Sequence, residues 1–358
     1  MLYVFDRELN FQGIIEGYSN FRWIRKYSKC GEFELHCGLT SEALGLLKKG
    51  NIVWKKDDFE AGYINHRNLK QDAEGKEILV VRGKFLTGYL SQRIIWGIET
   101  LNTTSELAIK QLVNSNAINP SNTDRKIDLM LLGEVKGYAQ TVSMQTSYKN
   151  LLDEAENIAS TNDLGIRTLI DIQNRQMIFD IYEGVDRTAG QNVNAPAIFS
   201  KEFENILEQE FIDSSTNFRN IALIAGEGEG SLRQLTTIGQ GIGLDRREIF
   251  IDARDLQQED LSTNEYIELL KNRGQIKLSE YADIQTFDSK INLNSNLTYK
   301  KDFDLGDLVT CTSKKWGITI DTRITEIEEI HDSNGKQINV IFGNNIPTLI
   351  DKLKAVMK

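Results

Sequence analysis

Apolar and polar residues alternate over short segments in the first 97 residues of the chain. The strictest example is 32–37, in which Phe33, Leu35 and Cys37 fall on one side and polar residues on the other. A period of two is typical of a β-strand with one buried face. Further short apolar segments lie at 51–54, 61–66 and 77–81. Strands of this length and spacing predict a first β-barrel-like domain over residues 1–97.

Apolar spacing becomes helical in the next part of the chain. The sequence Thr103–Glu106 predicts a capping box at the start of one helix. A second helix is predicted over 148–159, where Leu151 and Ala155 belong to an apolar stripe with helical spacing. Two strands are predicted to follow, at 167–172 and 176–182. We therefore expect residues 98–187 to form a compact α+β module.

Strand patterns return in the last part of the chain. They lie at 205–211, 217–225, 231–238 and 248–251. A second capping box, Ser262–Glu265, predicts a helix over about 262–283. Leu261 and Tyr266 are placed on either side of the cap to form a hydrophobic staple. We expect residues 188–358 to form a second β-rich barrel domain that carries this helix.

The final segments contain the clearest local signals. Strands are predicted at 307–312, 317–330 and 337–342. Ile324 and Ile327 fall out of register with each other, and a β-bulge near 325–326 would return Ile327 to the core face. Asn334–Gly335 predicts a hairpin turn, and a terminal helix is expected after Pro347. The predicted fold class is α+β and multi-domain, with two β-barrel-like domains, an intervening α+β module and a C-terminal helix.

Composition narrows the functional classes. The 52 acidic and 42 basic residues give a net charge of -10, which disfavours sequence-independent binding of nucleic acid, because phosphate contacts need a basic surface. No stretch approaches the ~20 apolar residues of a membrane span, and the amino terminus has no signal-peptide pattern. The three scattered cysteines, Cys30, Cys37 and Cys311, are expected to be reduced and buried. Folding in the cytoplasm is expected.

Residues that commonly carry catalysis or bind metals are sparse. Of the three histidines, His36 shares a predicted strand face with Glu32 and Glu34. Such a set could hold a metal, but it is more often a solvated polar edge, so we predict no metal and no cofactor. His331 lies beside the hairpin turn and is expected to be exposed. The glycine-rich segment 225–231 lacks the Lys-Ser/Thr pair of a phosphate loop and is expected to connect two strands.

One dense group of charged residues occupies 245–255. It comprises Asp245, Arg246, Arg247, Asp252, Arg254 and Asp255. We interpret these residues as ion pairs within the subunit or at a subunit interface, because 248–252 alternates like a strand with satisfied charges.

Two other functional classes are considered. In a cell-wall hydrolase, Asp252 and Asp255, or the Glu227 and Glu229 loop, would supply catalytic carboxylates. A carbohydrate-binding adhesin would expose aromatic side chains around a cleft. The tryptophans lie within or beside strand patterns instead and are expected in the core; they are Trp23, Trp54, Trp96 and Trp316.

Several segments carry sequences that are distinctive of one protein family. The most distinctive are Asn220–Gly230 and Gly243–Asp255. Others lie at 19–23, 31–35, 83–95, 302–309 and 316–327. Across these segments, which are spread over essentially the whole chain, the sequence resembles siphovirus tail hub proteins of Gram-positive phages and prophages.

The resemblance implies a hub fold shared with contractile-phage baseplate hubs and type VI secretion spike proteins. In that fold, two related β-barrel domains per subunit assemble as a homotrimer into a pseudo-sixfold ring, which adapts the tail tube to the tip. The family carries no catalytic residues to transfer to this chain. The implied protein is a virion structural protein of the tail, synthesised in the cytoplasm of the bacterial host. Its expected partners are the distal tail protein, the tape-measure protein, and tip or fibre proteins.

Three further expectations concern the ring. DNA would pass through it without specific binding, and some of the surplus Asp and Glu residues would line the lumen so that phosphates are not trapped. Subunits would meet through open strand edges, which are templates for pairing across an interface. No lytic or receptor-binding domain is expected after Lys358.

Overall fold

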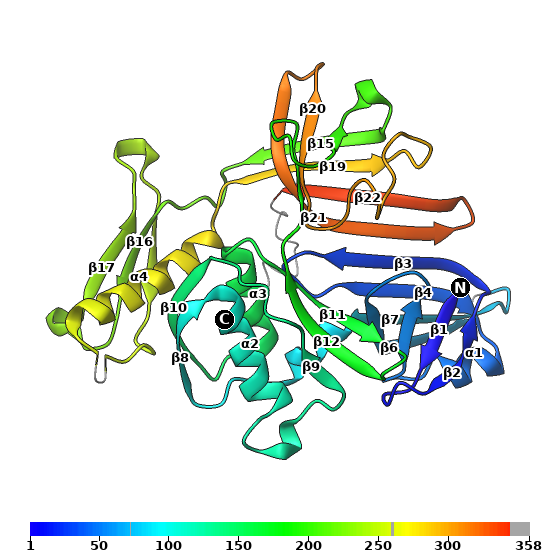
Figure 1. The fold of residues 1–358 in the computed structure, drawn as a ribbon, viewed down its shortest axis with the longest axis horizontal. Coiled ribbons are helices and arrows are strands. Elements are labelled where there is room, and N and C mark those ends of the chain that lie inside the picture. The colour runs from blue at the N-terminus through cyan, green and yellow to red at the C-terminus, as the bar shows by residue number, and fades with distance from the viewer. Residues whose placement is uncertain (72, 259–260, 344–358) are drawn as a thin grey trace.

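The computed structural model describes residues 1–71, 73–258 and 261–343 (Figure 1). A large sheet runs through the N-terminal and C-terminal parts, and smaller sheets lie in the middle module and in a projecting region. The helix predicted after Pro347 lies outside the described residues. No described helix is both long and apolar enough to cross a membrane.

The N-terminal part is built almost entirely of strands. Its elements are β1 (Leu2–Phe5), β2 (Phe11–Ile15), β3 (Tyr18–Lys26), β4 (Glu32–Gly38), α1 (Ser41–Leu46), β5 (Ile52–Lys55), β6 (Ala61–Gln71) and β7 (Glu77–Phe85). They pair in the order β3-β4-β7-β6-β5-β1-β2. Phe33, Leu35 and Cys37 of β4 point into one core around Trp23, so the strand predicted from alternation is confirmed.

This sheet does not close into a barrel among the described strands. β2 ends the strand order on one side. On the other side, the edge of β3 pairs with β21 (Ile318–Asp332) of the C-terminal part, not with β2. The first barrel expected over residues 1–97 is therefore an open sheet, because the edge that would close it joins the two parts of the molecule.

The middle module mixes short sheets with helices. Its elements are η1 (Leu86–Gln92), β8 (Ile98–Thr104), α2 (Ser105–Val113), η2 (Asn114–Ile118), η3 (Thr123–Arg125), β9 (Met130–Leu132), β10 (Thr141–Ser147), α3 (Leu151–Thr161), β11 (Gly165–Asp171) and β12 (Gln176–Tyr182). The helix predicted over 148–159 and the two predicted strands are confirmed, with small shifts at their ends. Ile109, Ala155 and Phe179 lie in one core that also reaches the N-terminal part.

The first predicted capping box is wrong. Thr104, not Thr103, caps α2, and its side chain accepts a hydrogen bond from the backbone N–H of Leu107. Glu106 is buried and accepts instead from Lys110 (2.8 Å) and from the backbone N–H of Lys136 (2.8 Å). The Glu106 carboxylate therefore does not cap the helix start, because it accepts hydrogen bonds from a loop that is distant in sequence.

The C-terminal part supplies the rest of the large sheet. Its elements are β13 (Asp186–Arg187), β14 (Ile198–Phe199), η4 (Lys201–Phe203), β15 (Ile206–Ser214), β19 (Ile284–Ile291), β20 (Leu308–Ser313), β21 and β22 (Gly335–Gly343). The order β15-β19-β22-β21 continues directly into β3, and β20 pairs with β21. Because β21 is shared with β3, the second expected barrel is not closed among these strands either.

The predicted bulge in β21 is confirmed. The register of β21 against β22 shifts between Ile324 and Glu326, so both Ile324 and Ile327 are fully buried in one core. The predicted hairpin is also confirmed, but its turn lies one residue earlier than expected: Asp332 lies opposite Gly335 across the two turn residues Ser333 and Asn334. Gly335 adopts φ +100°, a conformation that disfavours residues with a Cβ atom.

A small sheet and a helix project from the connection between β15 and β19 (Figure 1). The elements are β16 (Ile221–Ala225), η5 (Gly230–Leu232), β17 (Leu235–Gly239), η6 (Gly243–Asp245), β18 (Glu248–Asp252) and α4 (Thr263–Ser279). β16 is the central strand, antiparallel to β17 and parallel to β18. The predicted capping box of Ser262 and Glu265 is present, and Leu261 packs against the cluster that contains Tyr266.

We call the pairing of β3 with β21 the seam. A buried ion network lies under it. Arg25, in β3, is 1% exposed and lies opposite Ile327. Its guanidinium binds Glu60 of the N-terminal part (3.2 Å) and Asp304 of the C-terminal part (2.7 Å). It also donates to the Tyr299 hydroxyl (3.0 Å). One charged side chain therefore connects both parts of the molecule.

The middle module joins at the same place. Glu60 forms a β-bridge with Leu169 of β11. Tyr27 donates its backbone N–H to Thr325 (2.9 Å) and accepts from the N–H of Ile166 (2.9 Å). A Cβ atom at Gly306 would come within 2.5 Å of the Tyr27 ring, so a glycine is needed there for the three parts to meet. The limits expected for separate domains, at 97 and 187, stay predictions.

We predict that Ile327→Ala lowers the free energy of unfolding by about 2–5 kcal/mol, because it opens a cavity behind the bulge. Ile320→Ala is the matched control. Ile320 is only half-buried at the margin of the same core, so its truncation should cost about 1 kcal/mol. Urea unfolding of both variants checks this. Equal losses would contradict the assignment of Ile327 to the core face.

A second prediction concerns pH. Burial raises the pKa of Glu60 from 4.5 to about 7, although the Arg25 guanidinium opposes the shift. An acid with a raised folded-state pKa contributes stability that is present below its unfolded value and is lost as pH rises through the folded value. We expect wild-type stability to fall relative to Glu60→Gln between about pH 4.5 and 7. Urea unfolding of both proteins across this range would show parallel profiles if Glu60 did not titrate there.

Candidate functional site

The small projecting sheet has one face without a covering element among the described residues. α4 packs on Ala222, Ile224 and Ile251 on the other face. On the open face, Leu223 of β16 lies between Thr237 of β17 and Phe250 of β18. Leu223 is 38% exposed and Phe250 is 58% exposed. Strand residues with apolar side chains on both faces are typical of a sheet that is covered on both sides.

Charged side chains border this apolar surface. The Asp252 carboxylate accepts from Arg254 (2.7 Å) and is paired with Arg233. Hydrogen bonds from Arg254, followed by those from Arg233, lower the pKa of Asp252 to about 2. The Arg233 guanidinium also lies 5.9 Å from the centre of the Phe250 ring. We call the surface formed by the following residues the outer face: Leu223, Arg233, Leu235, Thr237, Phe250, Asp252 and Arg254.

The structure separates the six predicted charged residues into three places. Asp252 and Arg254 lie on the outer face. Asp255 turns toward α4, where Arg273 donates two hydrogen bonds to it (3.0 and 3.1 Å). Asp245, Arg246 and Arg247 lie in the connection that leads into β18. There Arg246 pairs with Glu248, Arg247 donates to the Ser215 carbonyl (2.7 Å), and the Asp245 carbonyl accepts from Asn220 (2.7 Å).

The loops at the two ends of the small sheet also expose apolar residues. Leu232, Ile242 and Leu244 are almost fully exposed, and Leu244 reaches 99%. The glycine-rich segment connects β16 with β17, as predicted. Its Gly226 allows the Tyr266 hydroxyl to approach, since a Cβ atom there would lie 2.4 Å from that oxygen. Glu227 accepts from the backbone N–H of Gln258 (3.2 Å).

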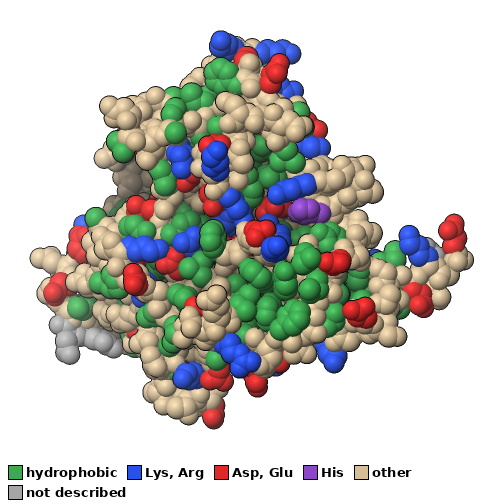
Figure 2. Space-filling model, turned by 45° about the vertical axis from the view of Figure 1, so that its right-hand side comes forward, with side chains coloured by type: hydrophobic (Ala, Val, Ile, Leu, Met, Phe, Trp, Pro, Cys, Tyr) green, Lys and Arg blue, Asp and Glu red, His purple; other side chains and the backbone are tan. Residues whose placement is uncertain are grey.

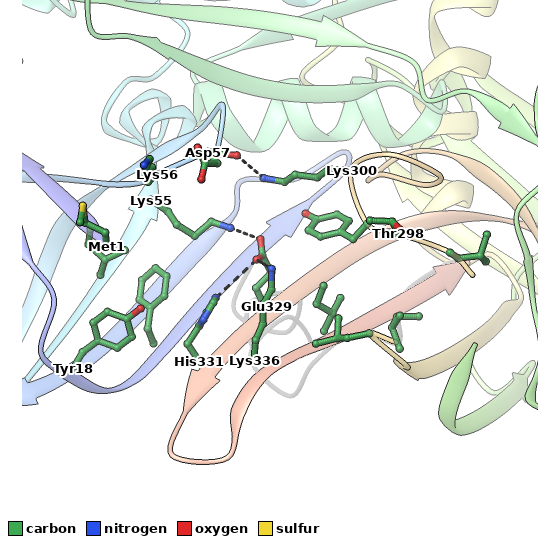
Figure 3. A pocket seen from close by; sticks show the side chains of 17 residues that line it. Met1, Tyr18, Lys55, Lys56, Asp57, Thr298, Lys300, Glu329, His331 and Lys336 are labelled. Carbon is green, nitrogen blue, oxygen red and sulfur yellow. Dashed lines mark hydrogen bonds and ion pairs between the residues drawn. The ribbon is translucent and has the colours of Figure 1, made fainter. Parts of the chain in front are cut away.

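A cleft of about 410 Å³ opens beside the seam (Figure 3). Its base is apolar and includes Leu2 and Phe21 from the N-terminal part and Ile338 from β22. Four lysines line it: Lys55, Lys56, Lys300 and Lys336. In Figure 3 the Lys55, Lys336 and His331 side chains converge on Glu329. We call this the seam cleft.

Two carboxylates near the seam cleft, Glu329 and Asp58, are already bound by lysines. Glu329 is 1% exposed and pairs with Lys55 and with Lys336 (3.0 Å). Burial favours a raised pKa, but the two lysines outweigh it and lower the pKa of Glu329. Asp58 lies behind the cleft and pairs with Lys300 (2.9 Å). Its pKa is lowered to about 2, because Arg25 and the lysines outweigh the effect of burial.

Two expectations about exposure are wrong. His331 is half-buried in the seam cleft, where burial lowers its pKa. Trp96 and Trp316 are exposed, at 51% and 43%, whereas Trp23 is in the core and Trp54 is partly buried. Position within or beside a strand does not specify whether another element covers that side chain.

No group of metal-binding side chains occurs within the described ranges. Glu34 is bound by Arg82 and by His36 (2.5 Å), and Glu32 by Lys26 (2.9 Å). Cys30, Cys37 and Cys311 form no disulfide; Cys37 and Cys311 are buried, and Cys30 is partly exposed.

Figure 2 shows a side of the molecule on which hydrophobic side chains form a broad patch bordered by charged residues and a histidine.

The outer face and the seam cleft were not predicted from the sequence. Alternation did contain one signal, since Phe250 is an apolar residue on the face of 248–252 opposite Ile249 and Ile251. The seam cleft had no such signal, because its residues come from both ends of the chain.

Several solved structures are similar to this chain in fold. A tail protein from Neisseria meningitidis MC58 has a TM-score of 0.59 at 12% identity, with 96% of each chain covered. Prophage tail protein gp18 from Listeria monocytogenes EGD-e has a TM-score of 0.57 at 12% identity, with 99% of this chain and 98% of that chain covered. The E. coli c3393 protein, a component of the type VI secretion system, has a TM-score of 0.49 at 9% identity, with 97% and 77% covered.

Sequence comparison gives the family. No curated protein matches the chain. Residues 1–344 match the family described as Siphovirus ReqiPepy6 Gp37-like protein, which confirms the siphovirus family expected from the sequence. The chain shares the fold of these two tail proteins from Neisseria and Listeria and belongs to the Siphovirus ReqiPepy6 Gp37-like protein family.

Proposed function

We propose that this protein is a structural subunit of a phage or prophage tail tip, a baseplate hub that assembles into a ring and adapts the tail tube to the tip. The observation that carries this proposal is the extent of the fold match. Almost the whole chain superimposes on almost the whole of two tail proteins from bacteria. Within the compared region, no part of the chain remains that could form a separate catalytic domain. DNA would pass through the ring without specific binding.

The outer face supports self-assembly. Its apolar centre, Leu223 and Phe250, is bordered by the ion-paired Asp252 and Arg254. Protein interfaces commonly have this arrangement, with a desolvated apolar centre and a polar border. We propose that a second subunit covers the outer face in a homotrimer. The open edges of β2 and β15, at the two ends of the large sheet, are further candidates for contacts between subunits.

Other tail components would complete the assembly. The distal tail protein, the tape-measure protein and tip or fibre proteins are the proposed partners, in a virion tail assembled in the host cytoplasm. The surplus of ten negative charges would favour an acidic lumen that does not retain DNA phosphates.

The hydrolase alternative receives less support from the geometry. Asp252 is held by Arg254 and Arg233, and Asp255 by Arg273. A general acid must carry a proton near neutral pH, whereas the pKa of Asp252 is lowered to about 2. We therefore propose a non-enzymatic role for these carboxylates.

We predict that Phe250→Asp weakens association of the full chain roughly 30-fold or more, equivalent to about 2 kcal/mol, because it places a charge at the centre of the outer face. Native mass spectrometry over a concentration series should show a trimer for the wild type and a shift toward monomer for the variant.

The matched control is Phe203→Asp. Phe203 in η4 is 52% exposed, close to the 58% of Phe250, but it lies outside the small sheet. Its substitution should leave the trimer unchanged. A wild type that stays monomeric at every concentration would contradict self-assembly of the isolated chain, and equal weakening by both variants would contradict the outer face as the contact.

We also predict that the purified chain releases no soluble fragments from bacterial cell walls and that Asp252→Asn does not change this. The reason is that Asp252 and Asp255 are already bound by arginine. Release of reducing sugars and free amino groups would be measured. Turnover by the wild type that disappears in Asp252→Asn or Asp255→Asn would favour the hydrolase.

A further inference from the structure

The middle module exposes large side chains where two of its segments pair. The backbone N–H of Ile95 donates to the Lys149 carbonyl (2.9 Å), and that of Tyr148 donates to the Ile95 carbonyl (3.0 Å). Ile95 is buried, whereas its neighbours in the chain, Ile94 and Trp96, are 44% and 51% exposed. Tyr148 is 69% exposed. The paired segments therefore present one aliphatic and two aromatic side chains to solvent.

Two arginines border these side chains. The Arg125 guanidinium lies over the Trp96 ring, 4.2 Å from the ring centre. It donates to the Ile94 carbonyl and to the Asn116 side chain (3.4 Å). The Arg93 guanidinium donates in turn to the Arg125 carbonyl. These acceptors fix the positions of both guanidinium groups, but they carry no negative charge.

Neither arginine forms an ion pair with a carboxylate of the described chain. Burial and the positive charge of Arg93 lower the pKa of Arg125. Arginines elsewhere differ, since Arg82, Arg167 and Arg254 each bind a carboxylate. In a chain with a net charge of -10, these two neighbouring guanidinium groups keep a positive charge that an anionic group of another molecule could neutralise.

We call the surface formed by Arg93, Ile94, Trp96, Arg125 and Tyr148 the Trp96 surface. Trp, Tyr and Arg are the residue types that most often contribute the binding energy of protein interfaces. Their rings offer a large contact area with few bonds to immobilise, and a guanidinium can bind a carboxylate through two parallel hydrogen bonds. The Trp96 surface therefore has the composition of a binding site for a protein that offers both apolar and carboxylate groups.

A nucleic acid fits this surface less well, although aromatic rings and arginines also bind single strands. Asp124 and Asp128 are exposed on the same segment as Arg125. The successive phosphates of a long polyanion would meet these carboxylates, whereas a single carboxylate of a protein could reach Arg125 without approaching them. The charges around the Trp96 surface therefore favour a protein partner.

We propose that the Trp96 surface is a docking site for a partner protein that presents a carboxylate beside apolar side chains. The carboxylate would pair with Arg125 and Arg93, and the apolar side chains would cover Trp96 and Tyr148. The Trp96 surface shares no residue with the outer face. The proposal therefore goes beyond the self-assembly described above and does not depend on it.

The test observes the tryptophan indole N–H groups of the full chain by heteronuclear NMR, with each signal assigned by a Trp→Phe substitution. Trp96 reports on the proposed site. Trp316 is the internal control, because it is also exposed and follows Lys314 and Lys315 in the turn between β20 and β21. Its signal shows whether any exposed ring beside cations would respond.

Four probes separate the two contacts from each other and from nucleic-acid binding. They are a peptide with Asp on both sides of a Leu-Phe pair, its counterpart with Asn in place of Asp, its counterpart with Ser in place of Leu and Phe, and oligothymidylate of the same charge. The Asp peptide should shift the Trp96 signal saturably and leave the Trp316 signal unchanged. The Asn and Ser peptides should bind at least roughly fivefold more weakly, because each lacks one contact.

Variants locate the binding. Arg125→Gln should weaken binding of the Asp peptide at least roughly fivefold, because it removes the charge beside the Trp96 ring. Tyr148→Asn should weaken it too; it removes the ring, and Asn tolerates the φ of +53° at this position. The matched control is Lys315→Gln, which removes one exposed charge beside Trp316 and should leave binding unchanged. Thermal unfolding confirms that each variant is folded.

Several results would overturn the proposal. These are an unshifted Trp96 signal, equal binding of the Asn and Asp peptides, or a Trp316 shift at the same peptide concentrations. Unchanged binding in both Arg125→Gln and Tyr148→Asn would exclude the assigned contacts. Tighter binding of oligothymidylate, lost in Arg125→Gln, would identify a nucleic-acid site. A Trp96 shift that depends on protein concentration alone would assign the surface to a contact between copies of this chain. Loss of trimer in Phe250→Asp bears on none of these outcomes.

Discussion

The pairing of β3 with β21 over the buried Arg25 side chain holds the two ends of the chain together. Strands about 300 residues apart in sequence share one ladder, from Glu326 opposite Lys26 to His331 opposite Phe21. The Arg25 guanidinium is satisfied only when Glu60 and Asp304 are both in place. Separating the parts would leave a buried charge without its partners, which costs several kcal/mol. The middle module is tied to the same point through Glu60 and Leu169.

This shared ladder has consequences for the surface. Because β3 and β21 use their edges on each other, the N-terminal and C-terminal parts remain open sheets, and the remaining ends of the large sheet are β2 and β15. The seam also creates the cleft, since β5, β22 and the loop before β20 bring lysines from distant segments around Glu329 of β21. The surface features among the described residues are therefore open strand edges, a cleft between two parts, and the outer face of the projecting sheet, and the proposed assembly would use one or more of them.

The carboxylates near the seam cleft and on the projecting sheet mostly form ion pairs with lysines or arginines. Glu329 and Asp58 are buried against lysines, and Asp252 and Asp255 are bound by arginines. The lowered pKa values of Glu329, Asp58 and Asp252 make these carboxylates stable as anions and poorly suited to exchange protons near neutral pH. A protein that contributes surfaces to an assembly needs this fixed charge, because complementary charges orient partners as they approach.

The sequence by itself determined the local elements. Alternation in 32–37, the bulge between Ile324 and Glu326, the hairpin at 332–335 and the capping box of Ser262 each depend on residues close together in the chain. Only the tertiary structure decided the open sheets, the diversion of Glu106 from its helix cap, the burial of His331 and the exposure of Trp96 and Phe250. Periodicity specifies which side of a strand is apolar. It does not specify which distant segment, or which second molecule, covers that side or pairs with its edge.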